Sequence, residues 1–435
     1  MKLNKKSFFK IHSWIGIRLS ILFFIVCFSG TLATLSNEMD WLFNSEIRAV
    51  PQEELAPRNL IMENLKKTYP QAEVTFWDHS GEKYMCDILQ VKNNGKRSYV
   101  FANPYTGEIQ GKTQMTVQRY FRNLHYFLFI PFQIGHFTVL IFGFLLLISL
   151  ITALVFYKKW WRKLFELKTG KGTLVFFRSL HRLVGVWSVP FTLLFSITGI
   201  WYFLERTNTA GLGRIANPRA PKIEALENLD STENLDAKTL DYDKAIEIAK
   251  TQIPNLELGF IVPSRGSSGT IYITGTSEVP LVRPRANRVY LHPETYEVVS
   301  VQKATEIGAI MYLNDIADPL HFGYWGGLVT KIIWFILGLG ISSLVGTGIW
   351  ITLKRKAIKR KKNKQRIMGH WRYVNWGIFA VMLFFMYYIS IDTYQVSTLG
   401  LCAISAGWAM FLSVVYYLFV YRLNNTVEKE IFKNQ

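Results

Sequence analysis

Histidine is the residue type whose number and spacing in this chain could do chemistry. Six of the eight histidines fall at two levels of the predicted membrane helices: His12, His181 and His370 near one membrane surface, and His125, His136 and His321 near the other. An imidazole in the hydrocarbon layer of a membrane is energetically unfavourable unless it has a polar partner. A histidine within a membrane helix is therefore a functional candidate by default. Imidazole is a standard axial ligand of haem iron, and bundle interiors are a standard place for it. Two levels of imidazole therefore predict two haem b groups, each held by two histidines.

The first pair of ligands is predicted from a repeated stretch. FFKIHSWIGIRLSILFFIVCFSGTLAT at 8–34 aligns with FFRSLHRLVGVWSVPFTLLFSITGIWYF at 176–203. The matched positions are one histidine and two glycines in each copy: His12, Gly16 and Gly30, and His181, Gly185 and Gly199. On a straight helix each set would form one stripe, because residues four apart share a face and eighteen residues make five turns. The two histidines would hold one haem between the repeats. Gly16 and Gly185 would let this haem approach the helix backbone. Gly30 and Gly199 would let the second haem approach the backbone at the other level.

The second pair of ligands is predicted from the segments that begin at His125 and His321, which also align without a gap. Pro131 and the run GYWGG at 323–327 could break these helices and leave both histidines on interfacial segments. A histidine at a helix end is also a common interfacial anchor. His136 is the alternative ligand at this level, and its counterpart at the first level is His370. His79 and His292 are expected on the surface of soluble segments. Arg18 and Arg182 could pair haem propionates or simply extend towards the membrane surface.

The chain is a membrane protein by composition, since half of its 435 residues are hydrophobic and 15% are aromatic. Six uncharged or nearly uncharged runs are long enough to span a bilayer, which takes about 20 apolar residues: 14–35, 134–157, 183–204, 332–353, 374–391 and 394–421. Lys and Arg concentrate in the first ten residues, in 158–182 and in 354–372, whereas 36–122 and 205–331 are nearly balanced. The positive-inside rule then predicts cytoplasmic basic segments, cytoplasmic N and C termini, and two large segments on the outer side.

The two outer segments resemble each other. Each begins with a short amphipathic helix, near 58–68 and 242–252, and continues with four β-rich runs, which predicts two small α+β modules. The segment 207–240 is rich in Pro, Asn and acidic residues and is expected to be an extended or mobile linker. The predicted fold is a membrane all-α bundle of about six spans with two small extracytoplasmic modules, arranged as a tandem parallel repeat. Its parts are the spans 1–36, 123–160, 176–204 and 319–355, the modules 37–122 and 205–318, and a C-terminal hairpin 370–422.

Several classes of function find no support in the sequence. There is no catalytic triad, P-loop or Cys-rich metal motif, and the basic segments are better explained as topology anchors than as nucleic-acid contacts. The three cysteines do not form a disulfide framework, because only Cys86 lies outside a predicted span. The predicted cytoplasmic loops are too short for a flavin or nicotinamide domain. Electrons would therefore come from a quinol in the bilayer or from a separate cytoplasmic reductase.

These residues together resemble a family, the PepSY-associated transmembrane-helix proteins, also called iron-regulated membrane proteins. The resemblance covers about 1–355 and rests on His12 with Gly16, His181 with Gly185, the Leu-His pairs at His125 and His321, and the Pro-x-Thr turns of the two modules. The family includes inner-membrane ferric-siderophore reductases. The resemblance therefore implies a PepSY-like character for the modules and a haem-containing reductase of the bacterial inner membrane that passes electrons to periplasmic ferric chelates.

Two other functions compete with electron transfer. The chain could be a non-enzymatic sensor or regulator whose outer modules bind peptides or peptidases, and its purified form would then be colourless. It could also be a transporter that uses the membrane histidines to move protons or metal ions, as proteins with tandem repeats often do. Substrate uptake into sealed vesicles without a redox donor would identify that activity.

Overall fold

The computed structural model of the chain describes residues 4–93, 95–221, 223, 240–265, 269–359 and 370–421. The chain divides into two compact units. The helical unit comprises Met1–Leu35, Tyr120–Phe203 and Gly326–Gln435, and the sheet unit comprises Ser36–Arg119 and Leu204–Trp325. The predicted cytoplasmic C terminus lies outside the described residues, as do 224–239 of the predicted linker and 360–369 of the basic segment.

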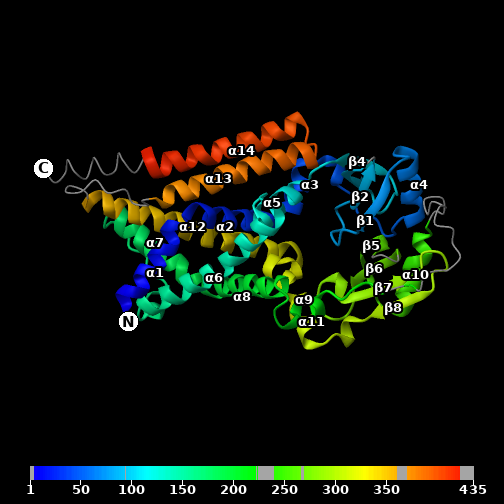
Figure 1. Cartoon of the computed structure of the whole chain (residues 1–435), viewed down its shortest axis with the longest axis horizontal. Helices are drawn as coiled ribbons and strands as arrows, with labels where there is room; N and C mark the ends of the chain where they lie inside the picture. Colours follow the sequence, from blue (N-terminus) through cyan, green and yellow to red (C-terminus); the bar gives the residue numbers. More distant parts are fainter. Residues whose placement is uncertain are drawn as a thin grey trace. The chain divides into compact units, whose positions relative to one another are not determined.

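The helical unit contains the predicted membrane spans (Figure 1). Its main helices are α1 (Lys5–Arg18), α2 (Ser20–Thr34), α5 (Val117–Phe127), α6 (Phe132–Phe156), α7 (Thr173–Trp187), α8 (Val189–Arg206), α12 (Gly327–Lys359), α13 (Trp371–Tyr388) and α14 (Thr398–Tyr416). Its described residues also form the short helices η2 (Trp160–Lys163), η8 (Ile389–Thr393) and η9 (Tyr417–Tyr421). By length and composition, four helices of the described chain can each cross a membrane, and up to six spans result if each of two bent pairs counts as one. The chain is a multi-pass membrane protein.

Both copies of the repeated stretch are bent, which contradicts the prediction of a straight stripe. α1 and α2 are bent by 75° at Leu19, and α7 and α8 are bent by 61° at Ser188. His12 and Gly30 therefore lie on different helices, so the eighteen-residue spacing does not place them on one face. In the second copy Pro190 explains the break, because proline has no N–H for the carbonyl four residues earlier. In the first copy the carbonyl of Arg18 accepts a hydrogen bond from the Asn375 side chain at 2.6 Å.

Breaks also separate the second pair of histidines from the spans that follow them. α5 ends at Phe127, and Leu128 and Phe129 then adopt left-handed φ angles of 55° and 54° before Pro131 begins α6. α11 (Ala309–Phe322) ends at Gly323, whose φ of 76° suits glycine, and η7 (Tyr324–Gly326) leads into α12. The sequence-based alternative that both helices break is confirmed. His125 and His321 thus lie near the C-terminal ends of short helices.

Small side chains allow the central helices of this unit to approach closely. A Cβ atom added to Gly338 of α12 would lie 2.5 Å from Oγ1 of Thr31 in α2. The Thr31 hydroxyl also lies 3.4 Å from that of Ser342, one turn further along α12. Close approach at small residues, with hydroxyls that bond across the contact, is a common way for membrane helices to associate. Here it fixes α2 against α12.

The sheet unit begins with α3 (Ser36–Phe43) and η1 (Ser45–Ile47), and its described residues form eight strands and four further helices. The strands are β1 (Glu73–Asp78), β2 (Asp87–Asn93), β3 (Lys96–Ala102), β4 (Ile109–Thr113), β5 (Glu257–Arg265), β6 (Thr270–Thr276), β7 (Asn287–Leu291) and β8 (Val298–Gln302). The further helices are α4 (Arg58–Thr68), α9 (Leu212–Ala216), α10 (Tyr242–Gln252) and α11, with 3₁₀ turns η3 (Thr209–Gly211), η5 (Pro284–Ala286) and η6 (Ala304–Glu306). The predicted amphipathic helices and β-rich runs are confirmed. Part of the predicted linker is helical instead, since η3 and α9 occupy 209–216.

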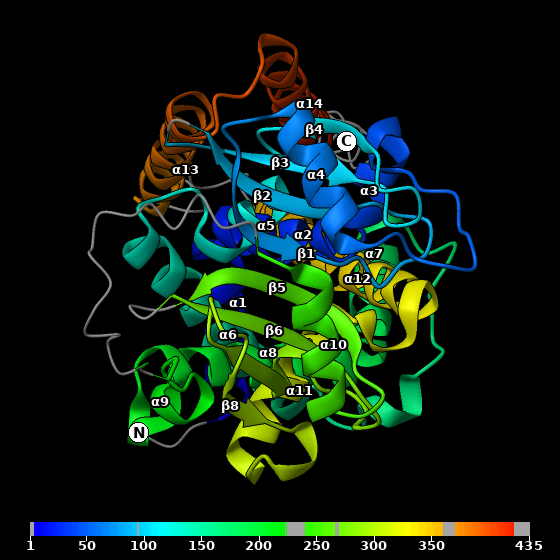
Figure 2. The ribbon, with the colours of Figure 1, turned by 90° about the vertical axis from the view of Figure 1, so that its right-hand side faces the viewer.

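The strands form one antiparallel sheet rather than two separate modules, in the order β4-β3-β2-β1-β5-β6-β7-β8. β1 and β5 join its two halves through the partners Trp77 with Ile261 and Asp78 with Phe260. Figure 2 shows α4 and α10 on the same face of this sheet. The sequence predicted each half correctly, but no local pattern indicated that β1 and β5 would pair edge to edge.

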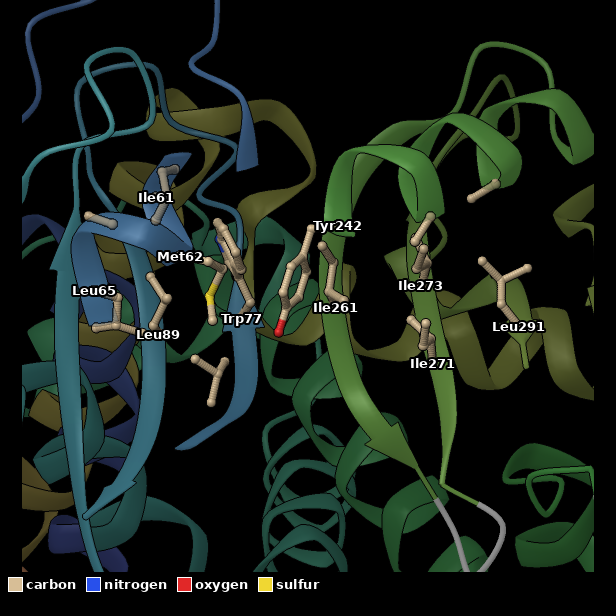
Figure 3. Close-up of a cluster of buried hydrophobic side chains, with 14 of the residues drawn as sticks. Ile61, Met62, Leu65, Trp77, Leu89, Tyr242, Ile261, Ile271, Ile273 and Leu291 are labelled. Atoms are coloured by element: carbon tan, nitrogen blue, oxygen red, sulfur yellow. The ribbon is translucent and has the colours of Figure 1, made fainter. Parts of the chain in front are cut away.

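The hydrophobic core of the sheet unit crosses the junction between its halves. Ile61, Met62 and Leu65 of α4 pack in the same cluster as Ala245 and Ala249 of α10. At the junction, the Trp77 ring of β1 faces the Tyr242 ring of α10, with centroids 5.4 Å apart (Figure 3). One continuous core therefore stabilises both halves together.

The first turns of α4 and α10 cap each other. The backbone N–H groups of Arg58 and Asn59 donate to the Asp243 carboxylate at 2.7 and 3.0 Å. In return, the N–H of Tyr242 donates to the Asn59 side chain at 2.8 Å, and that side chain donates to Asp241. These bonds satisfy donors that a helix N-terminus cannot satisfy internally. They give the two halves a second connection besides the β1–β5 ladder.

Replacing Trp77 by phenylalanine is expected to destabilise the protein by about 2–5 kcal/mol, because the change leaves both a cavity and a buried acceptor without its donor. The indole of Trp77 donates to the Asp87 carboxylate at 2.8 Å, and both residues are fully buried. Thermal unfolding followed by circular dichroism measures the effect. The control is Tyr105→Phe, which removes an exposed hydrogen bond to Lys83. An unchanged melting temperature for Trp77→Phe would contradict this account of the core.

Candidate functional site

His12 and His181 lie close together in the helical unit. His12 is on α1 and His181 on α7, and their ring centroids are 6.4 Å apart with an interplanar angle of 81°. Both rings are partly buried. The His12 ring also contacts Phe156 of α6 at a centroid distance of 5.5 Å. Two histidines from segments far apart in sequence are thus brought to one place.

Both rings of this pair are oriented through Nδ1. Nδ1 of His12 lies 3.0 Å from the backbone carbonyl of Ser149, which can only accept, and 3.1 Å from the Ser149 hydroxyl; the carbonyl contact favours the tautomer that carries the proton on Nδ1. Nδ1 of His181 lies 2.9 Å from the Thr347 hydroxyl, which donates its own proton to the Ser343 carbonyl. Nδ1 of His181 is therefore also the donor. In each ring the basic lone pair is left on Nε2, as in histidines that ligate metals.

The spacing of the pair fits two ligands of one iron. A bond between a metal and an imidazole nitrogen is about 2 Å long, so two rings on opposite sides of one ion have centroids roughly 6 Å apart. The observed 6.4 Å matches that distance. A Cβ added to Gly16 would meet no atom within 4 Å, and at Gly185 it would meet only Leu344, at 3.8 Å. The space beside Gly16 is thus open, whereas Leu344 already packs at van der Waals distance beside Gly185, so a flat macrocycle would need that leucine side chain to move.

His125 occupies a different place in the helical unit. Its Nδ1 lies 2.9 Å from the carbonyl of Val26 in α2, so Nδ1 is again the donor. The ring lies directly against Gly30, where an added Cβ would be 2.7 Å from its Cε1 atom. Gly199 instead faces Gly143 of α6, with an added Cβ 3.4 Å from the Gly143 Cα atom. Gly30 therefore makes room for an imidazole, and Gly199 for a neighbouring helix.

The remaining membrane histidines differ in their surroundings. His136 is 3% exposed, and Nδ1 lies 3.1 Å from the carbonyl of Tyr126. Its ring stacks on Phe132 at 5.2 Å. His321 is partly buried in the sheet unit, on α11, next to Phe322. His370 is exposed just before α13. The structure thus brings His12 and His181 together, and it provides an anchored ring at His125 and at His136.

The other two histidines of the sheet unit, His79 and His292, have structural roles. Nδ1 of His79 lies 2.7 Å from the buried carboxylate of Asp87. His292 is 7% exposed, and its Nδ1 accepts from the backbone N–H groups of Glu294 and Thr295 at 3.2 Å. The prediction that both lie on the surface is wrong for His292, because its ring closes the turn between β7 and β8.

Sequence reasoning missed the residues that orient the first pair. Ser149 and Thr347 are not at matching positions of the aligned repeats, so the alignment gives no reason to single them out. Gly348 lies against the His181 ring, with an added Cβ 3.4 Å from its Cε1 atom. In the sequence these residues are recognisable only as a hydroxyl or a glycine within an apolar run. Membrane helices contain many such residues, so this pattern does not single them out. Arg182 pairs with Glu166 at 3.4 Å and donates to its carbonyl at 2.8 Å.

Asp40 supports the helix that carries His125. Its two carboxylate oxygens accept the backbone N–H groups of Val117 and Gln118, at 2.6 and 2.8 Å, at the start of α5. Asp40 is 5% exposed, and this burial raises its pKa to about 6, although the two hydrogen bonds act in the opposite direction. A carboxylate at a helix N-terminus satisfies free donors and complements the helix dipole. Asp40 therefore fixes where α5 begins.

The raised pKa of Asp40 predicts a pH dependence of stability. A group with a higher pKa in the folded protein favours folding below its unfolded pKa of about 4, and this contribution is lost as the pH rises through about 6. Between pH 4 and 7 the loss is up to about 3 kcal/mol. We expect the wild-type melting temperature to fall over this range by more than that of Asp40→Asn, whose side chain keeps one acceptor oxygen, loses the second hydrogen bond at every pH and does not titrate. Parallel pH profiles of the two proteins would contradict this prediction.

Comparison with known proteins places the chain. Residues 9–355 match the family described as the PepSY-associated TM region. The chain is also 25% identical over 254 residues to the uncharacterized protein PA4219 of Pseudomonas aeruginosa. That similarity covers 54% of this chain and 63% of the relative. Because the family match extends from α1 into α12 and includes His12, His125, His181 and His321, the chain belongs to the PepSY-associated TM region family.

Proposed function

We propose that this protein binds haem b and passes electrons across the membrane to ferric chelates, such as ferric siderophores, for iron acquisition. The observation that carries the proposal is the His12–His181 pair. Its rings have the spacing of two axial ligands, at 6.4 Å between centroids, and each uses Nδ1 for a hydrogen bond. Both Nε2 atoms are thus left available for iron, and the surrounding helices exclude bulk water.

Each residue near the pair has a role in this proposal. Ser149 and Thr347 hold the two rings in the tautomer that presents Nε2. Gly16 leaves open space for the macrocycle, and Gly185 carries no side chain of its own between the ring and Leu344. When bound, the haem supplies one-electron transfer at its iron. The protein's contribution is to orient the ligands and to keep the site dry.

A second haem, on the other side of the membrane, completes the path for electrons. We assign it to His125 and His321, with His136 as the alternative to one of them. Support comes from the hydrogen bond of His125 Nδ1 to Val26 and from the room that Gly30 provides for its ring. The matched sequence positions of His125 and His321 favour a tandem parallel repeat, with one ligand from each half.

The orientation follows from charge. The basic segments near the N-terminus, at 158–182 and at 354–372 lie in the cytoplasm, and the sheet unit lies in the periplasm of a bacterial inner membrane. A quinol or a separate cytoplasmic reductase supplies the electrons. Reduction at the periplasmic side converts iron(III) to iron(II), a softer ion that binds hard oxygen ligands less tightly and is released for uptake.

Absorption spectroscopy of the purified protein tests this function. Protein produced with an adequate haem supply is expected to show a Soret band and, after reduction with dithionite, sharp α and β bands. Ferric citrate or a ferric siderophore added to the reduced protein should then restore the oxidised spectrum. A colourless protein would overturn the proposal and favour a PepSY-type sensor or regulator. Substrate uptake into sealed vesicles by a colourless protein would instead favour a transporter.

A further inference from the structure

The C-terminal hairpin, formed by α13, η8 and α14, lies beyond the region that matches the family. Membership of the family therefore gives it no role. Figure 1 shows α13 and α14 side by side. Polar side chains within membrane helices are rare unless they have a partner, so the polar contacts that this hairpin makes with the rest of the helical unit indicate where it acts.

The first contact holds the break after the helix that carries His12. Asn375 of α13 is 1% exposed, and its side-chain amide donates to the carbonyl of Arg18 at 2.6 Å. Arg18 is the last residue of α1, next to the 75° bend. Trp371, one turn earlier on α13, packs edge-to-face on Trp14 of α1 at 5.5 Å. α13 thus contacts α1 on the side chain of Trp14 and on the backbone at its end.

The second contact holds the helix that carries His125. Tyr394, which follows η8, accepts a hydrogen bond through its hydroxyl from the Asn123 side chain at 3.0 Å. One turn earlier on α5, the Tyr120 hydroxyl accepts from the indole of Trp408 in α14 at 2.9 Å and donates to the sulfur of Met386 at 3.2 Å. Asn123 is 4% exposed, so loss of its partner leaves a buried donor.

Between these contacts the hairpin packs on α2 through aromatic rings. Phe411 of α14 stacks on Phe24 of α2 at 5.8 Å, and Phe24 stacks on Phe28 at 5.3 Å. α2 lies between the two histidine helices in the chain, and its Val26 carbonyl holds the His125 ring. The hairpin therefore touches α1 at its end, α2 at Phe24, and α5 at Tyr120 and Asn123.

From these contacts we infer that the C-terminal hairpin is a positioning element that fixes the two histidine-bearing helices α1 and α5 relative to α2. Asn375 holds the bend that sets the direction of α1, and Tyr394 with Trp408 holds α5. The hairpin itself touches no cofactor in this scheme, and it acts through the helices on which His12 and His125 lie. The inference rests on the proposed haem ligation, since position matters most for a metal ligand.

Electron paramagnetic resonance of the oxidised protein tests this role, because it separates low-spin haem with two histidine ligands from high-spin haem that has lost one. Asn375→Leu is expected to weaken the low-spin signal assigned to the His12 site. Tyr394→Phe is expected to weaken the low-spin signal assigned to the His125 site. His12→Ala and His125→Ala identify which signal is which. Loss of one hydrogen bond should change the ratio of low-spin to high-spin haem by roughly two- to tenfold.

The matched control is Tyr387→Phe. The Tyr387 hydroxyl bonds Ser405 within the hairpin at 2.7 Å, so the same chemical change is made at a hydrogen bond that involves neither α1 nor α5. Tyr394→Phe removes only the hydroxyl and keeps the aromatic ring. This variant therefore still tests the positioning role if Asn375→Leu fails to fold. A wild-type protein without haem would overturn the proposed function and the positioning role together. If the wild type contains haem and Tyr394→Phe and Tyr387→Phe both have the same spectrum as the wild type, the positioning role alone is overturned.

Discussion

Replacing either His12 or His181 by alanine is expected to remove about half of the haem, because each ring supplies one of two axial bonds to one of two irons. The 6.4 Å separation of the rings implies a shared ligand site rather than two independent ones. The double variant should therefore lose no more haem than either single variant, since residues that act as a unit are not additive. The pyridine haemochrome assay on protein of known concentration gives the stoichiometry.

Two further variants sharpen this experiment. His370→Ala removes an exposed imidazole outside the pair and should retain the full haem content. Thr347→Val removes the hydroxyl that bonds His181 but leaves the ligand in place, so it should retain haem but shift its reduction potential. A full haem content in both single variants and in the double variant would disprove this ligand pair. If the single variants keep all of their haem and only the double variant loses half, either histidine suffices as a ligand.

Replacing Gly30 by alanine is the second change with a large expected effect. The added methyl group would lie 2.7 Å from Cε1 and 2.8 Å from Nδ1 of His125, so the imidazole must move or α2 and α5 must separate. Glycine to alanine in a helix interior normally stabilises by about 1 kcal/mol, whereas an added methyl group in a filled site costs about 1–3 kcal/mol. We therefore expect loss of the haem assigned to His125 and little gain in thermal stability.

Gly377→Ala is the matched control for this prediction. Gly377 also lies within a membrane helix, α13, and an added Cβ there would meet no atom within 4 Å. This variant should keep both haems and melt at or slightly above the wild-type temperature. Haem content and thermal unfolding measured on both variants separate a local displacement of His125 from a general effect of alanine. If Gly30→Ala retained full haem, the proposed role of His125 as an axial ligand would be contradicted.

Local patterns in the sequence predicted the elements better than their angles and partners. The apolar runs indicated up to six spans, and alternation of apolar and polar residues indicated the strands of both halves. The bend at Leu19 was not foreseen, because it occurs without proline and coincides with a hydrogen bond to Asn375, more than 350 residues away. The single eight-stranded sheet depends in the same way on two backbone pairings between β1 and β5.

The candidate site shows the same division. Matched histidines in two repeats predicted the pairing of His12 with His181, and the structure brings these two rings together. Their partners Ser149 and Thr347 depend on which face α6 and α12 turn towards α1 and α7, which is decided by packing. The sequence predicted that Gly30 makes room for a haem, on the assumption of one straight helix. That helix is bent, and Gly30 instead makes room for the His125 ring.

The seam between β1 and β5 has a consequence for biosynthesis. About 180 residues separate its partners, so at roughly 5–20 residues per second the ribosome needs on the order of ten to forty seconds between completing β1 and producing β5. Throughout that interval β1 is an open edge, and such edges invite pairing with other chains. The edge strand of the first half is therefore open to pairing with other chains until β5 has been made.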